Sequence, residues 1–103
     1  MRMRVRYSAH AEEKIRIRLI PRSSVRLVLR NPEYKFYDVA SAANVSIAVV
    51  SLDSEKVGLV VAFVVDKDGI RVITVYPVRD FRGEMRRKVN SGRWVNLGLA
   101  SPV

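Results

Sequence analysis

The chain has 103 residues, of which 49% are hydrophobic and 28% charged, enough for one packed domain over residues 1–103. Having no cysteine and only one histidine, it lacks the means for a disulfide framework, a thiolate nucleophile or a Cys/His zinc cluster, so we expect no metal and no cofactor. A formal net charge of +9, and no apolar run near the roughly 20 residues of a membrane span, argue against a membrane protein and favour an anionic partner.

The first residues alternate arginine with apolar side chains. Over residues 1–7 this period of two places Arg2, Arg4 and Arg6 on one face, which predicts a short edge strand or an extended arm. This stretch has no apolar region of the kind found in a signal peptide, so we expect a cytoplasmic protein.

Residues 9–20 allow two interpretations. Ala11, Ile15 and Leu19 recur at helical spacing, after a serine that is a suitable N-cap. Residues 15–19 also alternate apolar and basic side chains, as a half-buried strand does. Periodicity alone leaves both interpretations open.

A second helix is predicted over residues 23–30. Val25, Val28 and Leu29 have helical spacing there, and the Asn-Pro pair that follows ends the helix. The first third of the chain is therefore expected to form a helical hairpin.

The middle of the chain is rich in β-branched and aromatic residues, which favour strands. Four strands are expected, over residues 34–39, 45–52, 59–65 and 70–78. Short polar linkers separate the last three and favour hairpins. The sequence thus predicts an α+β fold in which two N-terminal helices pack on one face of a four-stranded antiparallel meander sheet.

The remainder, residues 80–103, is expected to be a basic loop and tail with room for one helical turn. Its densest cluster is Arg86-Arg87-Lys88, and these consecutive residues cannot all face a core. One hypothesis is that these side chains bind the backbone phosphates of a nucleic acid.

Basic residues are concentrated at the two ends of the chain. Residues 1–30 carry a net charge of +7, residues 31–70 a net charge of −3, and residues 71–103 a net charge of +5. This asymmetry favours RNA or DNA as the partner. The absence of glutamine and the abundance of arginine are features of many archaeal or thermophilic proteins.

Several motifs recur in an order that resembles a known family. They are Tyr7-Ser8-x-His10-Ala11-Glu12-x-x-Ile15-x-x-Arg18, then Ile20, Val25 and Leu29, then Asn31-Pro32, and finally Val72-Ile73-Thr74-Val75-Tyr76-Pro77. Over residues 7–94 this pattern resembles an archaeal and bacterial family of small domains related to the RelE-like and BrnT-like toxins. The chain departs from that pattern at Lys14, where the family often has Arg, and at Leu19, where it often has Gly in a tight turn.

The resemblance implies a RelE-like architecture and favours the helix over residues 9–20. Active RelE-like toxins cut RNA without a metal, which requires a base, an acid and cations beside the phosphate. The implied function is therefore RNA binding, with metal-independent endoribonuclease activity of the toxin–antitoxin type or a domain derived from it. An antitoxin protein is the second implied partner.

Four residues are candidates for this chemistry. His10 is the first choice for proton transfer, because histidine exchanges protons readily near neutral pH. Tyr76 can donate a proton or stack on a base, and the forked guanidinium groups of Arg71 and Arg79 can clamp a phosphate. Each also has an ordinary explanation as a capping, packing or solvated side chain.

Further basic residues, and one tryptophan, are candidate contacts to nucleic acid. They are Arg16, Arg18, Arg82, Arg86, Arg87, Lys88, Arg93 and Trp94. Trp94 can stack on a base, although burial of its indole is the alternative.

Two other classes of function stay open at this point. One is a non-catalytic module that binds nucleic acid, and the other is a small interaction domain for an acidic protein partner. Resemblance in fold does not separate either from an enzyme.

Overall fold

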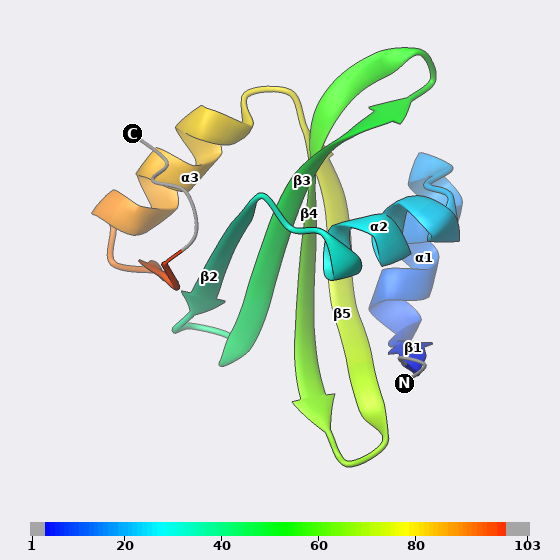
Figure 1. Cartoon of the computed structure of the whole chain (residues 1–103), viewed down its shortest axis with the longest axis horizontal. Coiled ribbons are helices and arrows are strands. Elements are labelled where there is room, and N and C mark those ends of the chain that lie inside the picture. Colours follow the sequence, from blue (N-terminus) through cyan, green and yellow to red (C-terminus); the bar gives the residue numbers. More distant parts are fainter. Residues whose placement is uncertain (1–3, 99–103) are drawn as a thin grey trace.

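The computed structural model describes residues 4–98, which form one mixed six-stranded sheet with helices on both of its faces (Figure 1). The elements in chain order are β1 (Val5–Tyr7), α1 (Ala9–Arg18), α2 (Arg22–Arg30), β2 (Tyr34–Asp38), β3 (Ala43–Leu52), β4 (Glu55–Asp66), β5 (Gly69–Val78), α3 (Phe81–Asn90) and β6 (Trp94–Asn96). The strand order across the sheet is β1-β5-β4-β3-β2-β6. Only the β1–β5 pairing is parallel among these strands.

Tight turns create the central meander. Asp53 and Ser54 join β3 to β4 with φ angles of 53° and 64°, the left-handed pair that suits a two-residue hairpin. Gly69 begins β5 with a φ of 116°, a conformation that favours glycine. The three longest strands are thereby held in antiparallel register.

The α1–α2 hairpin covers one face of the sheet. Ser8 caps α1 by accepting a hydrogen bond from the Ala11 N–H at 3.1 Å, and Ala11 and Ile15 face the core. On α2, Val25 and Val28 are fully buried against the same apolar cluster. The helical interpretation of residues 9–20 is confirmed, as is the second helix.

Helix α3 covers the opposite face. Its apolar stripe is Phe81, Met85 and Val89, and Met85 is fully buried against side chains of β2, β3, β4 and β6. Asp80 caps the helix by accepting a hydrogen bond from the Gly83 N–H at 3.0 Å. The sheet therefore lies between two helical layers, each with its own core (Figure 1).

The predicted arrangement of two helices on a four-stranded antiparallel meander, and with it the assignment of a RelE-like fold, is wrong. The class α+β holds, and the four predicted strands are present as β2 to β5, but β1 and β6 extend the sheet at its two edges and β1 runs parallel to β5. The expected basic loop over residues 80–103 contains α3 and β6, while residues 99–103, like residues 1–3 of the expected arm, lie outside the described part. None of the helices in residues 4–98 is long and apolar enough to cross a lipid bilayer.

Candidate functional site

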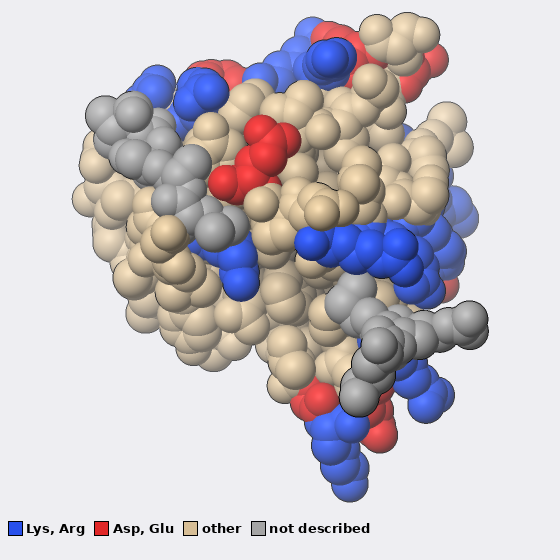
Figure 2. Space-filling model, in the orientation of Figure 1, with Lys and Arg blue, Asp and Glu red and all other residues tan. Residues whose placement is uncertain are grey.

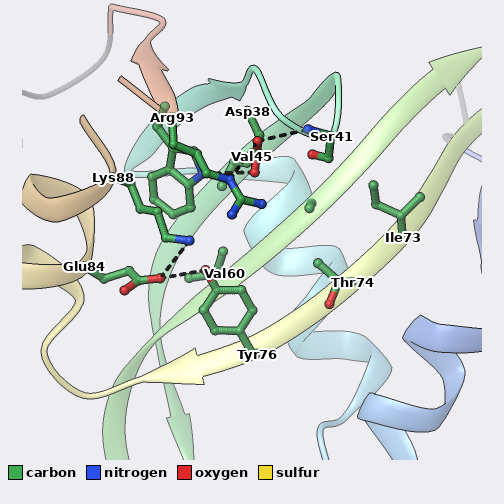
Figure 3. A pocket seen from close by; sticks show the side chains of 12 residues that line it. Asp38, Ser41, Val45, Val60, Ile73, Thr74, Tyr76, Glu84, Lys88 and Arg93 are labelled. Carbon is green, nitrogen blue, oxygen red and sulfur yellow. Dashed lines mark hydrogen bonds and ion pairs between the residues drawn. The ribbon is translucent and has the colours of Figure 1, made fainter. Parts of the chain in front are cut away.

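A pocket of about 310 Å³ lies on the face of the sheet that carries α3 (Figure 3). Helix α3 packs toward the β2 edge and leaves part of this face open over β4 and β5 (Figure 1). The residues that line the opening come from the strands, α3 and the turns beside β2 and β6: Asp38, Ser41, Val45, Val60, Ala62, Ile73, Thr74, Tyr76, Glu84, Lys88, Arg93 and Trp94.

Asp38 is a buried carboxylate at one end of the pocket. Its Oδ1 accepts hydrogen bonds from the Ala40 N–H at 3.0 Å and the Ser41 N–H at 3.2 Å, and its Oδ2 accepts one from the Trp94 Nε1–H at 3.2 Å. Arg93 Nε donates to Oδ1 at 3.2 Å. Burial opposes ionisation of this carboxyl, but these hydrogen bonds outweigh it and lower the pKa of Asp38 below its ordinary value.

The same contacts orient Arg93. Because its Nε is bound to Asp38, the two terminal nitrogens of the guanidinium extend into the pocket, as Figure 3 shows. The hydrogen bond to the ionised Asp38 also raises the pKa of Arg93. The guanidinium group of Arg93, which can bond to two oxygens of a phosphate or carboxylate, therefore faces the cavity.

Tyr76 and Glu84 form the opposite side of the pocket. The Tyr76 hydroxyl donates a hydrogen bond to Glu84 Oε2 at 2.9 Å, and burial, reinforced by this carboxylate, raises the pKa of Tyr76 above its ordinary value. Lys88 Nζ lies 3.9 Å from the same oxygen (Figure 3). Arg87 contacts Oε1 at 3.4 Å. The Tyr76 phenol therefore holds its proton and donates it in a hydrogen bond to the Glu84 carboxyl group.

This arrangement brings an acid, a base and two cations to one cavity. A carboxylate can take a proton, a phenol can give one, and the Lys88 ammonium and Arg93 guanidinium can stabilise negative charge between them. Each cation also has an acidic neighbour, Glu84 for Lys88 and Asp38 for Arg93. The two cations and the two carboxylates at the pocket therefore balance one another in charge.

The outer surface of α3 is basic. Arg82 and Arg86 are exposed one turn apart and have no ion pair among the described residues, while the side chain of Arg87 is 64% exposed despite its contact with Glu84. Figure 2 shows Lys and Arg side chains over the upper end of α3 on one flank of the molecule, and others over α1 and α2 on the opposite flank. The outer surface of α3 thus carries cations that are available to an anionic chain.

Of the sequence-predicted site residues, the structure brings Tyr76, Lys88, Arg93 and Trp94 together. Trp94 is only 3% exposed, and its ring packs 5.1 Å from that of Phe36. Its indole supports the pocket wall and donates to Asp38, so the prediction that it stacks on a base does not fit its burial.

The other predicted catalytic residues lie elsewhere. His10 is exposed on α1, which covers the opposite face of the sheet from Tyr76, so the two cannot act on one bond. Arg79 pairs with Glu55 at 2.8 Å, and Arg71 is exposed on β5 beside β1. None of these three lines the pocket.

Arg16 and Arg18 are also separated from the pocket by the sheet. Both are exposed on α1, in the layer opposite α3. The two basic ends of the chain therefore form two surfaces and not one.

Sequence reasoning missed Asp38 and Glu84. Tyr34, Phe36 and Asp38 alternate along β2, a pattern that places the aspartate on the buried face. Recognition of α3 as a helix would have placed Glu84 next to its buried apolar face. In residues 4–98, no three His, Cys, Asp or Glu side chains converge in a way that could hold a metal ion.

The chain matches no protein-family model, no curated protein and no solved structure. The relationship to RelE-like toxins therefore stays a prediction from the sequence motifs. Function has to be inferred from the geometry of the pocket and the charge around it.

Proposed function

We propose that this protein binds RNA on the face of the sheet that carries α3, and cleaves it in the pocket without a metal. The observation that carries the proposal is the hydrogen-bonded Tyr76–Glu84 pair, which faces the same cavity as Lys88 and Arg93. The exposed arginines of α3 supply the phosphate contacts around it.

In the proposed reaction Glu84 acts as the base. It takes the proton of a ribose 2′-hydroxyl, and the 2′-oxygen then bonds to the adjacent phosphorus. As the bond from phosphorus to the 5′-oxygen breaks, Tyr76 gives its proton to that oxygen. Lys88 and Arg93 stabilise the negative charge on the phosphate, and the products are a 2′,3′-cyclic phosphate and a 5′-hydroxyl.

The contact between the two groups also restores the site. After the step Glu84 is protonated and Tyr76 is a phenolate, separated by a hydrogen bond that is 2.9 Å long in the resting state. The proton passes from Glu84 to Tyr76 because the pKa of Tyr76 is raised, so the phenolate is the stronger base. No external proton carrier is required.

A second candidate function is RNA binding without cleavage. The balance of charge in the pocket favours it, since Asp38 and Glu84 already engage the two cations that would stabilise a transition state. An acidic protein partner of the antitoxin type would, in either case, be expected to cover the arginines of α3.

The test is incubation of the full chain with end-labelled single-stranded and structured RNA in chelator, repeated in a translating extract. Tyr76→Phe and Glu84→Gln are each expected to lower the cleavage rate about 100-fold or more, because each removes one proton-transfer partner. Tyr37→Phe and Glu13→Gln are matched controls, on exposed residues outside the pocket, that keep the wild-type rate.

Cleavage that survives both pocket substitutions would reject this site as the catalytic centre. RNA retention without cleavage in both assays would support the non-catalytic candidate instead. If the protein neither retains nor cleaves RNA, the RNA proposal is overturned and an acidic protein becomes the favoured partner.

A further inference from the structure

The pocket has an apolar floor that phosphate binding does not require. Val45, Val60 and Ala62 contribute it from β3 and β4, and Ile73 extends it on β5. Figure 3 shows Ile73 and Thr74 across the cavity from Lys88 and Arg93. One side of the pocket therefore offers apolar surface and the other offers charge.

The charges in the pocket also argue against a bare phosphate as its ligand. Lys88 and Arg93 are each paired with a carboxylate, so the pocket attracts an isolated anion weakly. Arg82 and Arg86, on the outer surface of α3, have no ion pair among the described residues. A ligand that joins an apolar ring to a phosphate would contact the floor as well as Lys88 and Arg93, which phosphate alone cannot do.

The size of the cavity limits how much of such a ligand can enter. Its volume of about 310 Å³ is at the lower end of the roughly 300–1,000 Å³ of small-molecule sites. Hydroxyl groups at the rim, from Ser41 and Thr74, are placed to bond the polar edge of a planar ring. The cavity has room for one nucleoside.

We infer that the pocket takes one unstacked nucleotide of single-stranded RNA, with its base on the apolar floor and its phosphate at Lys88 and Arg93. The inference rests on the proposed function and specifies its substrate. A base within a duplex is stacked on its neighbours and cannot reach the floor unless it is turned out, at a cost of a few kcal/mol. Sequence-tolerant binding of single strands commonly uses such platforms for bases.

The test compares three probes of equal length at fixed salt, by fluorescence anisotropy with the full wild-type chain. They are a twelve-nucleotide RNA of mixed sequence, the same strand annealed to its complement, and a twelve-unit abasic ribose-phosphate chain. The single strand is expected to bind about ten-fold or more tightly than either of the others, since only it can place a base in the pocket.

A matched pair of substitutions locates the effect. Ile73→Ala removes floor that faces the pocket and is expected to weaken single-strand binding by about ten-fold, leaving abasic binding unchanged. Ile70→Ala makes the same truncation three residues earlier on β5, where the side chain packs against the other core, and is expected to leave binding intact.

Equal affinity for the single strand and the duplex, or for the single strand and the abasic chain, would overturn this inference and leave RNA binding itself standing. Failure to bind any of the three probes would overturn both the inference and the proposed function. Even if Ile73→Ala does not fold, the relative affinities of the wild type for the three probes decide whether this inference holds.

Discussion

Leu19 ends α1 in a conformation that leucine rarely adopts. Its φ of 54° and ψ of 46° are left-handed, and the N–H of Ile20 donates to the Ile15 carbonyl at 3.0 Å, which completes the helix C-cap. The leucine side chain is 84% exposed and contributes little packing. The tight turn after α1 is therefore made by a leucine at a conformational cost.

Replacing Leu19 by Gly is expected to raise the free energy of unfolding by about 1 kcal/mol, because the left-handed strain outweighs the added chain entropy of glycine. Urea denaturation measures the change. Ile17→Gly, at an exposed position inside α1, is the control and is expected to lower stability by about 1 kcal/mol. A lower stability for Leu19→Gly would show that the turn carries no strain.

Asp38 links stability to pH. Its pKa is lowered in the folded protein, so the stability it contributes is fully present above the unfolded value of about 4 and is lost as the pH falls through the folded value. Asp38→Asn is expected to cost about 1–3 kcal/mol at pH 7, where its hydrogen-bonded charge is lost.

The measurement is the difference in free energy of unfolding between wild type and Asp38→Asn from pH 7 to pH 2. That difference should be constant above about pH 5 and shrink below about pH 4. Asp68→Asn, in the exposed β4–β5 turn, provides the control. A difference that persists unchanged to pH 2 would mean that the Asp38 charge does not stabilise the fold.

At the scale of elements, the sequence predicted two helices and the central meander because their signals are local. Val25 and Val28 mark one face of α2, and the long β-branched runs mark β3, β4 and β5. Strands β1 and β6 were harder to predict, because each has only three residues and is stabilised by pairing with a strand that is distant in the chain. No local periodicity could specify those partners.

Helix α3 was missed for a different reason. Its five charged residues dominate the segment and suggest a solvated loop, yet Phe81, Met85 and Val89 recur every four residues after Asp80, a suitable N-cap. The charged side chains thus obscured an apolar spacing that is typical of a helix. Because α3 holds Glu84 and Lys88 beside the sheet, and the turn before β6 holds Arg93, missing these elements also hid the pocket.

Met85 anchors α3 to the sheet. It is fully buried, and Met85→Ala is expected to lower the free energy of unfolding by about 3 kcal/mol through the cavity it leaves. Arg86→Ala, on the adjacent exposed position, is expected to change stability by less than about 0.5 kcal/mol. A loss for Met85→Ala no greater than that of Arg86→Ala in urea denaturation would show that α3 is not docked on this face.

For the molecule as a whole, the sheet separates two basic surfaces that the sequence presents only as two basic ends. The α1–α2 layer carries Arg16 and Arg18, and the α3 layer carries Arg82 and Arg86 on the outer surface of α3. A ligand in the pocket meets the second surface and not the first. The charge alone predicted an anionic partner, and our proposal assigns that partner to the α3 surface.

The most direct measurement is RNA affinity across a range of salt for two double variants, Arg82→Glu/Arg86→Glu and Arg16→Glu/Arg18→Glu. Both lower the formal net charge of +9 by the same amount, so nonspecific attraction falls equally. We predict that the α3 variant binds about 100-fold more weakly and has a flatter salt dependence, while the α1 variant loses less than about five-fold. An equal loss in both variants, or a larger loss in the α1 variant, would contradict the claim that RNA engages the α3 face.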